Sequence, residues 1–174
     1  MKLILKILGG LAGLVLLLVV VAFFLPRQYQ VQRAIVIRAT ADTIMEQTAV
    51  LRQWKSWSAW HERDPKMKLA YSEQTTGVGA WVSWESKNEG NGKMTITEQT
   101  PTKLLYALEF PDYGMKSNGT MEARPESAGT RLTWSDEGDL GMNPMNRWFG
   151  LFLDKFIGTD FDRSLANLKK LIEK

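Results

Sequence analysis

An uncharged apolar run of nineteen residues, from Ile7 to Leu25, constrains the fold more than any other feature of the chain. As an α-helix the run would be about 28 Å long, which is close to the thickness of the hydrocarbon core of a bilayer. Lys2 and Lys6 precede the run and Pro26 follows it. The pattern therefore predicts a transmembrane anchor over residues 1–26, which crosses the membrane with residues 7–25, and one domain over residues 27–174.

Two other interpretations of the apolar run compete with an anchor. A helix buried in a protein core is rarely apolar on every face, which argues against a core helix. A cleaved signal peptide could use Val20, Val21 and Ala22 as its small-residue site. However, the run is longer than the apolar region of about 7–15 residues that is usual in such peptides. An uncleaved anchor is the favoured interpretation.

The charges that flank the run bear on the orientation of the chain. Lys2 and Lys6 favour a cytoplasmic amino terminus, which would place the domain on the periplasmic side of a bacterial inner membrane. Arg27 and the arginines at positions 33 and 38 favour the opposite orientation under the same rule. We expect the periplasmic side, because a short head of six residues is easily retained in the cytoplasm.

The sequence indicates few partners besides the membrane. Gly9 and Gly13 have the spacing that lets two membrane helices pack closely, so a weak homodimer is possible, although small residues are common in such helices. Without the two lysines that precede the run, 20 of the 22 Lys and Arg residues remain against 19 Asp and Glu, a net charge of +1. A nearly neutral domain has no basic footprint for nucleic acid.

Missing residue types exclude several kinds of chemistry. The chain has no cysteine, which excludes disulfides, thiolate metal sites and cysteine nucleophiles. It has one histidine, His61, so a site built from several histidines is excluded as well. We expect no metal and no cofactor.

The hydrophobic pattern of the domain changes once along the chain. Alternating apolar and polar residues predict antiparallel strands, separated by turn residues, at 28–39, 68–73, 80–86, 93–99, 103–110, 115–123 and 130–136. A helix capped by Thr40 or Asp42 interrupts them early and leads into a tryptophan cluster. From Pro144 onward, apolar residues recur at helical spacing over about 28 positions, and Gly158 is expected to loosen or kink that helix.

These elements predict an α+β domain in which a curved antiparallel sheet wraps around one long C-terminal helix. The helix must bury its apolar stripe against one face of the sheet. The space between them is either a filled core or a ligand cavity.

Several short motifs resemble the SRPBCC superfamily, which is also called START-like or polyketide cyclase/dehydrase-like and has a helix-grip fold. The resemblance covers roughly residues 30–173, and no single motif is diagnostic. It implies a cavity for lipids, sterols, polyketides or other apolar molecules, and some members are enzymes. No catalytic signature can be carried over. The motifs are Trp54-x-x-Trp57-Ser58-x-Trp60 with Asp64-Pro65, Tyr71-Ser72 with Gly77-Val78-Gly79-Ala80, Ser83-Trp84, Gly92-Lys93-Met94-Thr95-Ile96, Gly129-Thr130-x-x-Thr133-Trp134, and Gly158-x-Asp160-Phe161 with Leu165, Leu168 and Lys169.

Large apolar residues are the candidates for the wall or mouth of such a cavity, because aromatic rings offer wide contact surfaces. Core and lid packing is the alternative role for the tryptophans among them. The segment from Met142 to Trp148 could gate an opening, rest on the bilayer or pack as an ordinary loop. The candidate ligand-binding residues are Trp54, Trp57, Trp60, Trp84, Met94, Ile96, Tyr106, Leu108, Trp134, Phe152 and Phe156.

Few polar residues offer catalytic chemistry. His61 could act as a general base, although a lone histidine in a charged stretch is more often exposed. Glu98 and Asp136 share the alternation of inward residues on their strands and could place a carboxylate at the end of a cavity, although a carboxylate at the end of a strand more often meets water. We therefore assign no catalytic residue. Three hypotheses stay open: a membrane-anchored module that binds an apolar molecule, a protein-interaction or stress-response module without a cavity, and a cyclase or hydratase-type enzyme.

Overall fold

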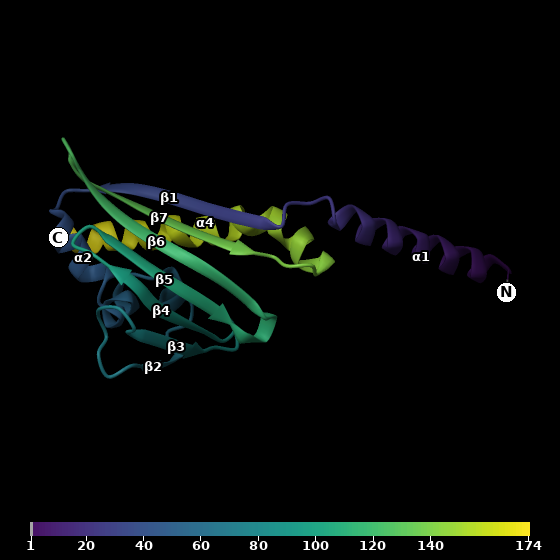
Figure 1. Ribbon diagram of the computed structural model, residues 1–174, viewed down its shortest axis with the longest axis horizontal. Coiled ribbons are helices and arrows are strands. Elements are labelled where there is room, and N and C mark those ends of the chain that lie inside the picture. The colour runs from purple at the N-terminus through teal and green to yellow at the C-terminus, as the bar shows by residue number, and fades with distance from the viewer. Residues whose placement is uncertain (1) are drawn as a thin grey trace.

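The computed structural model describes residues 2–174. Its first helix projects from one end of the domain (Figure 1). This helix, α1 (Lys2–Ala22), is long and apolar enough to cross a membrane, a property that signal sequences share. The elements that follow are β1 (Gln28–Ile37), α2 (Ala41–Thr48), the 3-10 helix η1 (Leu51–Ser56), α3 (Ala59–Arg63), β2 (Lys68–Tyr71), β3 (Trp81–Glu85), β4 (Gly92–Gln99), β5 (Lys103–Phe110), the 3-10 helix η2 (Pro111–Tyr113), β6 (Met115–Glu126), β7 (Gly129–Asp139) and α4 (Pro144–Ile172).

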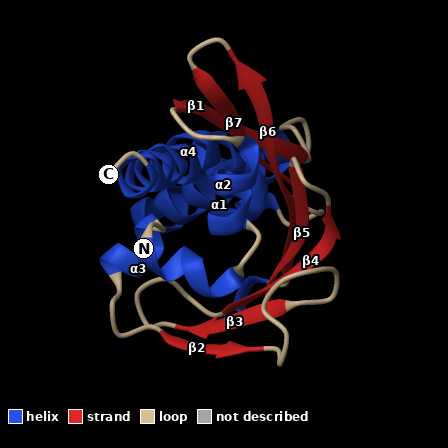
Figure 2. Ribbon diagram, turned by 90° about the vertical axis from the view of Figure 1, so that its left-hand side faces the viewer, coloured by secondary structure: helices blue, strands red, loops and turns tan. Residues whose placement is uncertain are grey.

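The seven strands form one antiparallel sheet in the order β1-β7-β6-β5-β4-β3-β2. Every strand therefore pairs with its sequence neighbour except β1, which closes one edge beside β7. The sheet curves around the helices, and α4 lies against its concave face next to β1 (Figure 2). The α+β helix-grip arrangement predicted from the sequence is confirmed.

Local signals explain where the helices begin. The Thr40 hydroxyl accepts a hydrogen bond of 3.3 Å from the backbone nitrogen of Thr43, so Thr40 is the cap of α2. The Asn143 side chain caps α4 in the same way, and Pro144 occupies the first helical position, where no backbone donor is needed. These residues fix the two points at which the chain leaves the sheet to cover its concave face.

A bulge in β4 ends the alternation of the strand before Glu98. Met94 and Ile96 point into the core, and an unbroken alternation would point Glu98 the same way. The pairing with β5 shifts between Ile96, opposite Tyr106, and Glu98, opposite Leu105. One extra residue on a strand reverses the alternation beyond it, so Glu98 is exposed to solvent.

The apolar pattern of α4 also changes phase. Leu153, Phe161, Leu165 and Leu168 face the core, whereas Phe152 and Phe156 are exposed and the sheet does not cover them. Successive residues of an α-helix are turned by about 100°, so the step of five residues from Phe156 to Phe161 rotates the stripe by about 140°. Phe152 and Phe156, which are candidates for the wall or mouth of a cavity, therefore lie on the outer face of the helix.

Gly158 lies in an unbroken stretch of α4, where it makes room for an arginine of β1. A Cβ atom at this position would lie 1.9 Å from a guanidinium nitrogen of Arg33. Arg33 binds Asp154 at 2.9 Å and Asp162 at 3.1 Å, one turn before and one turn after the glycine. The expected kink at Gly158 does not interrupt the helix, and the glycine instead admits an ion-pair network between α4 and the edge strand.

We expect Gly158→Ala to leave the free energy of unfolding unchanged or to lower it in the wild-type background. The better helix propensity of alanine, about 1 kcal/mol, is offset because the methyl group displaces Arg33 from exposed ion pairs that are each worth up to about 1 kcal/mol. In the Arg33→Ala background the same substitution should stabilise the protein by about 1 kcal/mol. Thermal unfolding in detergent micelles, followed by circular dichroism, measures both changes, and an equal gain in both backgrounds would contradict this account.

Candidate functional site

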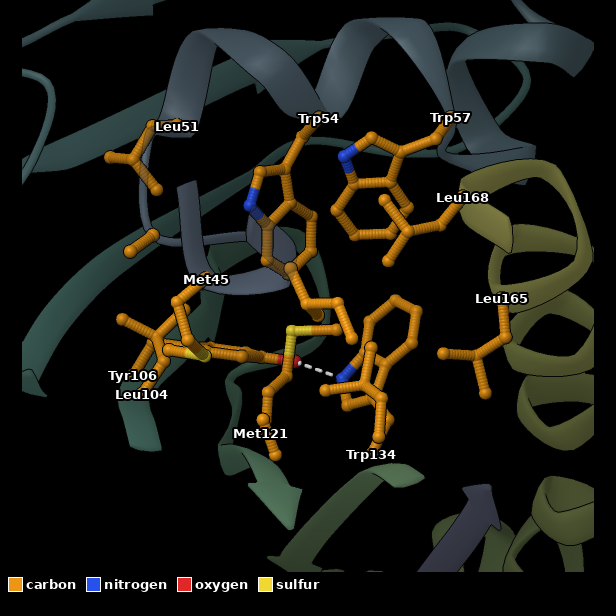
Figure 3. Close-up of a cluster of buried hydrophobic side chains, with 14 of the residues drawn as sticks. Met45, Leu51, Trp54, Trp57, Leu104, Tyr106, Met121, Trp134, Leu165 and Leu168 are labelled. Carbon is orange, nitrogen blue, oxygen red and sulfur yellow. Dashed lines mark hydrogen bonds between the residues drawn. The ribbon is translucent and has the colours of Figure 1, made fainter. Parts of the chain in front are cut away.

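Aromatic side chains fill the centre of the domain between the sheet and α4 (Figure 3). Trp134 of β7 stacks on Phe161 of α4 with ring centroids 3.9 Å apart. Trp54 and Trp57 of the segment around η1 pack edge-on against Trp134, at 5.5 and 5.7 Å. Edge-to-face and offset contacts of this kind add to the stability that apolar burial provides. The aromatic cluster joins the sheet, the short helices and α4.

The structure divides the eleven candidate ligand-binding residues into three groups. The buried group belongs to the core and consists of Trp54, Trp57, Met94, Ile96, Tyr106 and Trp134. The partly buried group packs against this core and consists of Trp60, Trp84 and Leu108. The last two, Phe152 and Phe156, lie on the exposed face of α4. Most of the candidates are therefore brought together, but they pack against one another.

A buried hydrogen-bond group lies beside this core on the concave face of the sheet. Asp136 of β7 is 3% exposed, and its two oxygens accept hydrogen bonds from the hydroxyls of Tyr29, at 2.8 Å, and Ser117, at 3.0 Å. Burial raises the pKa of Asp136 to about 6, against the effect of its two donors. Burial and the nearby charge of Asp136 together raise the pKa of Tyr29. Asp136 thus faces inward, in phase with Leu132 and Trp134 of its strand.

Glycine makes room for the aromatic ring next to this group. A Cβ atom at Gly119 of β6 would lie 2.0 Å from the ring of Tyr106 on the neighbouring strand. The Tyr106 hydroxyl, which is fully buried, accepts a hydrogen bond of 2.7 Å from the indole nitrogen of Trp134. The polar atoms in this part of the core are thus paired internally, which suits a structural role.

His61 has no such pairing. Its ring lies partly buried on α3, and neither ring nitrogen has a hydrogen-bond partner among the residues that the structure describes. Burial, and then the charge of Lys55, lower the pKa of His61. Within residues 2–174 no three His, Asp or Glu side chains come together as a metal site would require.

A pocket of about 180 Å³ opens where the chain enters the domain from α1. It lies between β1 and the first half of α4, and its lining combines apolar side chains with one buried cation. Sequence reasoning did not identify it, because the residues come from segments more than 100 positions apart. The lining residues are Pro26, Gln28, Tyr29, Gln30, Val31, Leu140, Arg147, Gly150, Leu151 and Asp154.

Two residues of α4 join the domain to α1. The Arg147 guanidinium is buried and donates to the backbone oxygens of Phe23, at 3.0 Å, and of Ala22 and Leu25, at 3.5 and 3.4 Å. The indole nitrogen of Trp148 donates to the Leu18 oxygen at 3.1 Å. The last carbonyls of a helix lack partners within the helix and form its negative end, so a cation is well placed there. Arg147 thereby closes the end of α1.

Comparisons with known proteins agree with this fold. The family model described as "Polyketide cyclase / dehydrase and lipid transport" matches residues 28–173. A comparison with curated sequences gives no significant match.

Solved structures of low sequence identity share the fold. Protein CV1439 from Chromobacterium violaceum is 19% identical, with a TM-score of 0.56 over 86% of this chain and 99% of its own. A protein from Thermobifida fusca, solved by NMR, is 16% identical, with a TM-score of 0.64 over 82% of this chain and 92% of its own. The di-domain ARO/CYC StfQ of the steffimycin biosynthetic pathway is 12% identical, with a TM-score of 0.62 over 84% of this chain and 51% of its own.

We expect Asp136→Asn to stabilise the protein at neutral pH. The folded state raises the pKa of Asp136 from 3.8 to about 6, so the folded protein binds this proton more tightly than the unfolded chain. The cost of the buried charge is therefore fully present above about pH 6 and is relieved as the pH falls towards 4. Asparagine can still accept from Tyr29 and can donate to Ser117 without carrying a charge.

Unfolding at several pH values, with the wild type and the variant side by side, measures this effect. The advantage of the variant should reach up to about 3 kcal/mol above pH 6 and should shrink towards pH 4. His61 contributes in the opposite direction, since its lowered pKa costs stability as the pH falls below 6.5, but it is common to both proteins and cancels in their difference. If the difference in free energy of unfolding between the two proteins did not change with pH, burial of the Asp136 charge would not be what destabilises the wild type.

Proposed function

Because the chain belongs to the polyketide cyclase/dehydrase and lipid transport family, we propose that it is a membrane-anchored module that binds a lipid-like or other apolar molecule between the sheet and α4. The observation that carries the proposal is the unequal burial of α4. From Gly158 onward the helix buries Phe161, Leu165 and Leu168, whereas the part before Gly158 buries only one apolar side chain, Leu153. This less covered half borders the pocket next to α1.

The dimensions of the pocket narrow the class of ligand. At about 180 Å³ it is smaller than the roughly 300–1,000 Å³ that is typical of pockets for drug-sized ligands. Its walls are mainly apolar. The exposed side chains of Gln28 and Gln30 are the groups that could orient a polar end, because the Tyr29 hydroxyl and the Arg147 guanidinium already bind within the protein. We infer a slender ligand, such as a single acyl chain with its headgroup outside, rather than a rigid ring system.

The junction with α1 supports an uncleaved anchor. Cleavage after Ala22 would remove α1 and the Ala22 oxygen, and it would turn the Phe23 and Leu25 oxygens into parts of a free amino-terminal end. Arg147, which is 6% exposed, would then lose the Ala22 oxygen and the fixed positions of the Phe23 and Leu25 oxygens, and would keep only the Gly141 oxygen as a backbone partner. An arginine stays charged when it is buried, so the loss would be costly. We propose that α1 stays attached and spans a bacterial inner membrane, with Lys2 and Lys6 in the cytoplasm and the domain in the periplasm.

A homodimer through α1 and an enzymatic activity have weaker support. Gly9 and Gly13 have open space beside them, so a weak homodimer through α1 stays a prediction. The raised pKa of Asp136 favours the enzyme hypothesis, since perturbed carboxyl groups often mark active sites. However, both oxygens of Asp136 already accept hydrogen bonds inside the protein. Binding is therefore the function that the geometry supports best.

Native mass spectrometry of the full chain, released from nanodiscs made with its own membrane lipids, tests the proposal. We expect a discrete added mass that survives the activation needed to remove loosely attached lipid. Leu151→Trp, which fills the pocket, should lower the occupancy at least threefold. Phe152→Trp is the matched control, because Phe152 is equally exposed on the same helix but does not line the pocket.

Either of two results would contradict the proposal. A bare protein mass after incubation with a panel of lipids would favour the protein-interaction hypothesis. An equal loss of occupancy in both tryptophan variants would show that the bound molecule does not occupy this pocket.

A further inference from the structure

An apolar surface surrounds the junction of α1 and α4. It consists of Phe23, Phe24, Met142, Met145 and Phe149, which we call the collar, and each member exposes about half of its side chain or more. Phe24 and Met145 are 84% and 75% exposed. Figure 1 shows that the end of α1 and the start of α4 lie at the same end of the domain. Exposed apolar residues gathered in one place mark a surface that contacts another apolar medium.

The collar also lacks charge. Between Leu140 and Leu153 the sequence has one charged residue, Arg147. The structure buries that guanidinium against the backbone of the α1 junction, so it does not contribute a charge to the surface. A solvent-facing half helix normally carries charged residues on its outer face. The outer face here carries phenylalanine and methionine instead.

Hydrogen bonds set the level of the collar relative to α1. Trp148, which lies next to the collar residue Phe149, donates to the oxygen of Leu18. Leu18 lies four residues, or about 6 Å along the helix, before Ala22, where α1 ends. If α1 spans the hydrocarbon core, the indole of Trp148 therefore reaches the outer part of the acyl region, next to the headgroups. Tryptophan and other aromatic side chains favour the boundary between the acyl chains and the headgroups.

We propose that the collar is a docking surface for the phospholipid bilayer, in which the first two turns of α4 are immersed at the headgroup boundary. This inference rests on the proposed function, because it requires α1 to be a membrane anchor. The contact holds the domain against the bilayer and directs the pocket between β1 and α4 to the membrane surface. An acyl chain can then pass between the bilayer and the pocket without crossing water.

Single-cysteine variants of the full chain test the proposal directly, because the natural sequence contains no cysteine. A spin label is attached at Leu14→Cys in α1, at Met145→Cys or Phe149→Cys in the collar, and at Lys155→Cys further along α4. The proteins are placed in nanodiscs of phosphatidylethanolamine and phosphatidylglycerol. Power-saturation measurements then compare access to oxygen, which dissolves in the bilayer, with access to a water-soluble nickel chelate.

We expect the Leu14 label to be protected from nickel, and each collar label to have at least threefold lower nickel access than the Lys155 label. Circular dichroism should show unchanged folding, since Met145, Phe149 and Lys155 are exposed. If the Leu14 label is protected from nickel but the collar labels are fully accessible to it, the docking surface is overturned and the anchor is not. Accessible Leu14 would overturn the anchor and the docking surface together.

A second copy of the chain is the other possible cover for the collar, and the same labels distinguish it. Contact between two copies would bring collar labels together and broaden their spectra through dipolar coupling. Diluting labelled protein with unlabelled protein would then sharpen the spectra and restore nickel access at one label per disc. That result would overturn the bilayer proposal, whereas protection that persists at one chain per disc supports it.

Discussion

The stacked contact between Trp134 of β7 and Phe161 of α4 is the interaction on which the rest of the structure depends. A single long helix cannot bury its apolar stripe alone, so it needs a sheet that curves around it. The contact lies where the core-facing half of α4 crosses the concave face, and Trp54, Trp57 and Trp60 pack edge-on against Trp134. Most of the candidate ligand-binding residues therefore form the core between the sheet and α4.

The sequence predicts the order of elements well because each element carries a local signal. Alternation identifies the seven strands, and helical spacing identifies α4. The regular patterns break where the phase changes, at the bulge before Glu98 and at the five-residue step between Phe156 and Phe161. The bulge depends on pairing with β5, which a local pattern does not contain, whereas the five-residue step can be counted in the sequence.

The candidate site was less predictable for a different physical reason. Large apolar side chains have the same residue types whether they fill a core or line a cavity, so composition cannot separate the two. Asp136 could be found because its alternation holds. The pocket, Arg147 and Trp148 could not be found, because their partners in α1 and β1 lie 100 or more positions away. Gly158 likewise had a local interpretation, a kink, and a distant cause, Arg33.

The two halves of α4 meet different surroundings, and Arg147 explains how they are connected. The second half packs against the sheet, whereas the start of the first half contacts the end of α1 through a buried charge. Because a guanidinium remains charged under all ordinary conditions, its burial is stabilised by the carbonyl oxygens around Phe23 together with that of Gly141. Helix α1 is thus a structural partner of the domain and not a flexible tether. The junction fixes the orientation of the domain relative to α1, and the apolar side chains left uncovered around it favour an apolar medium at that end of the domain.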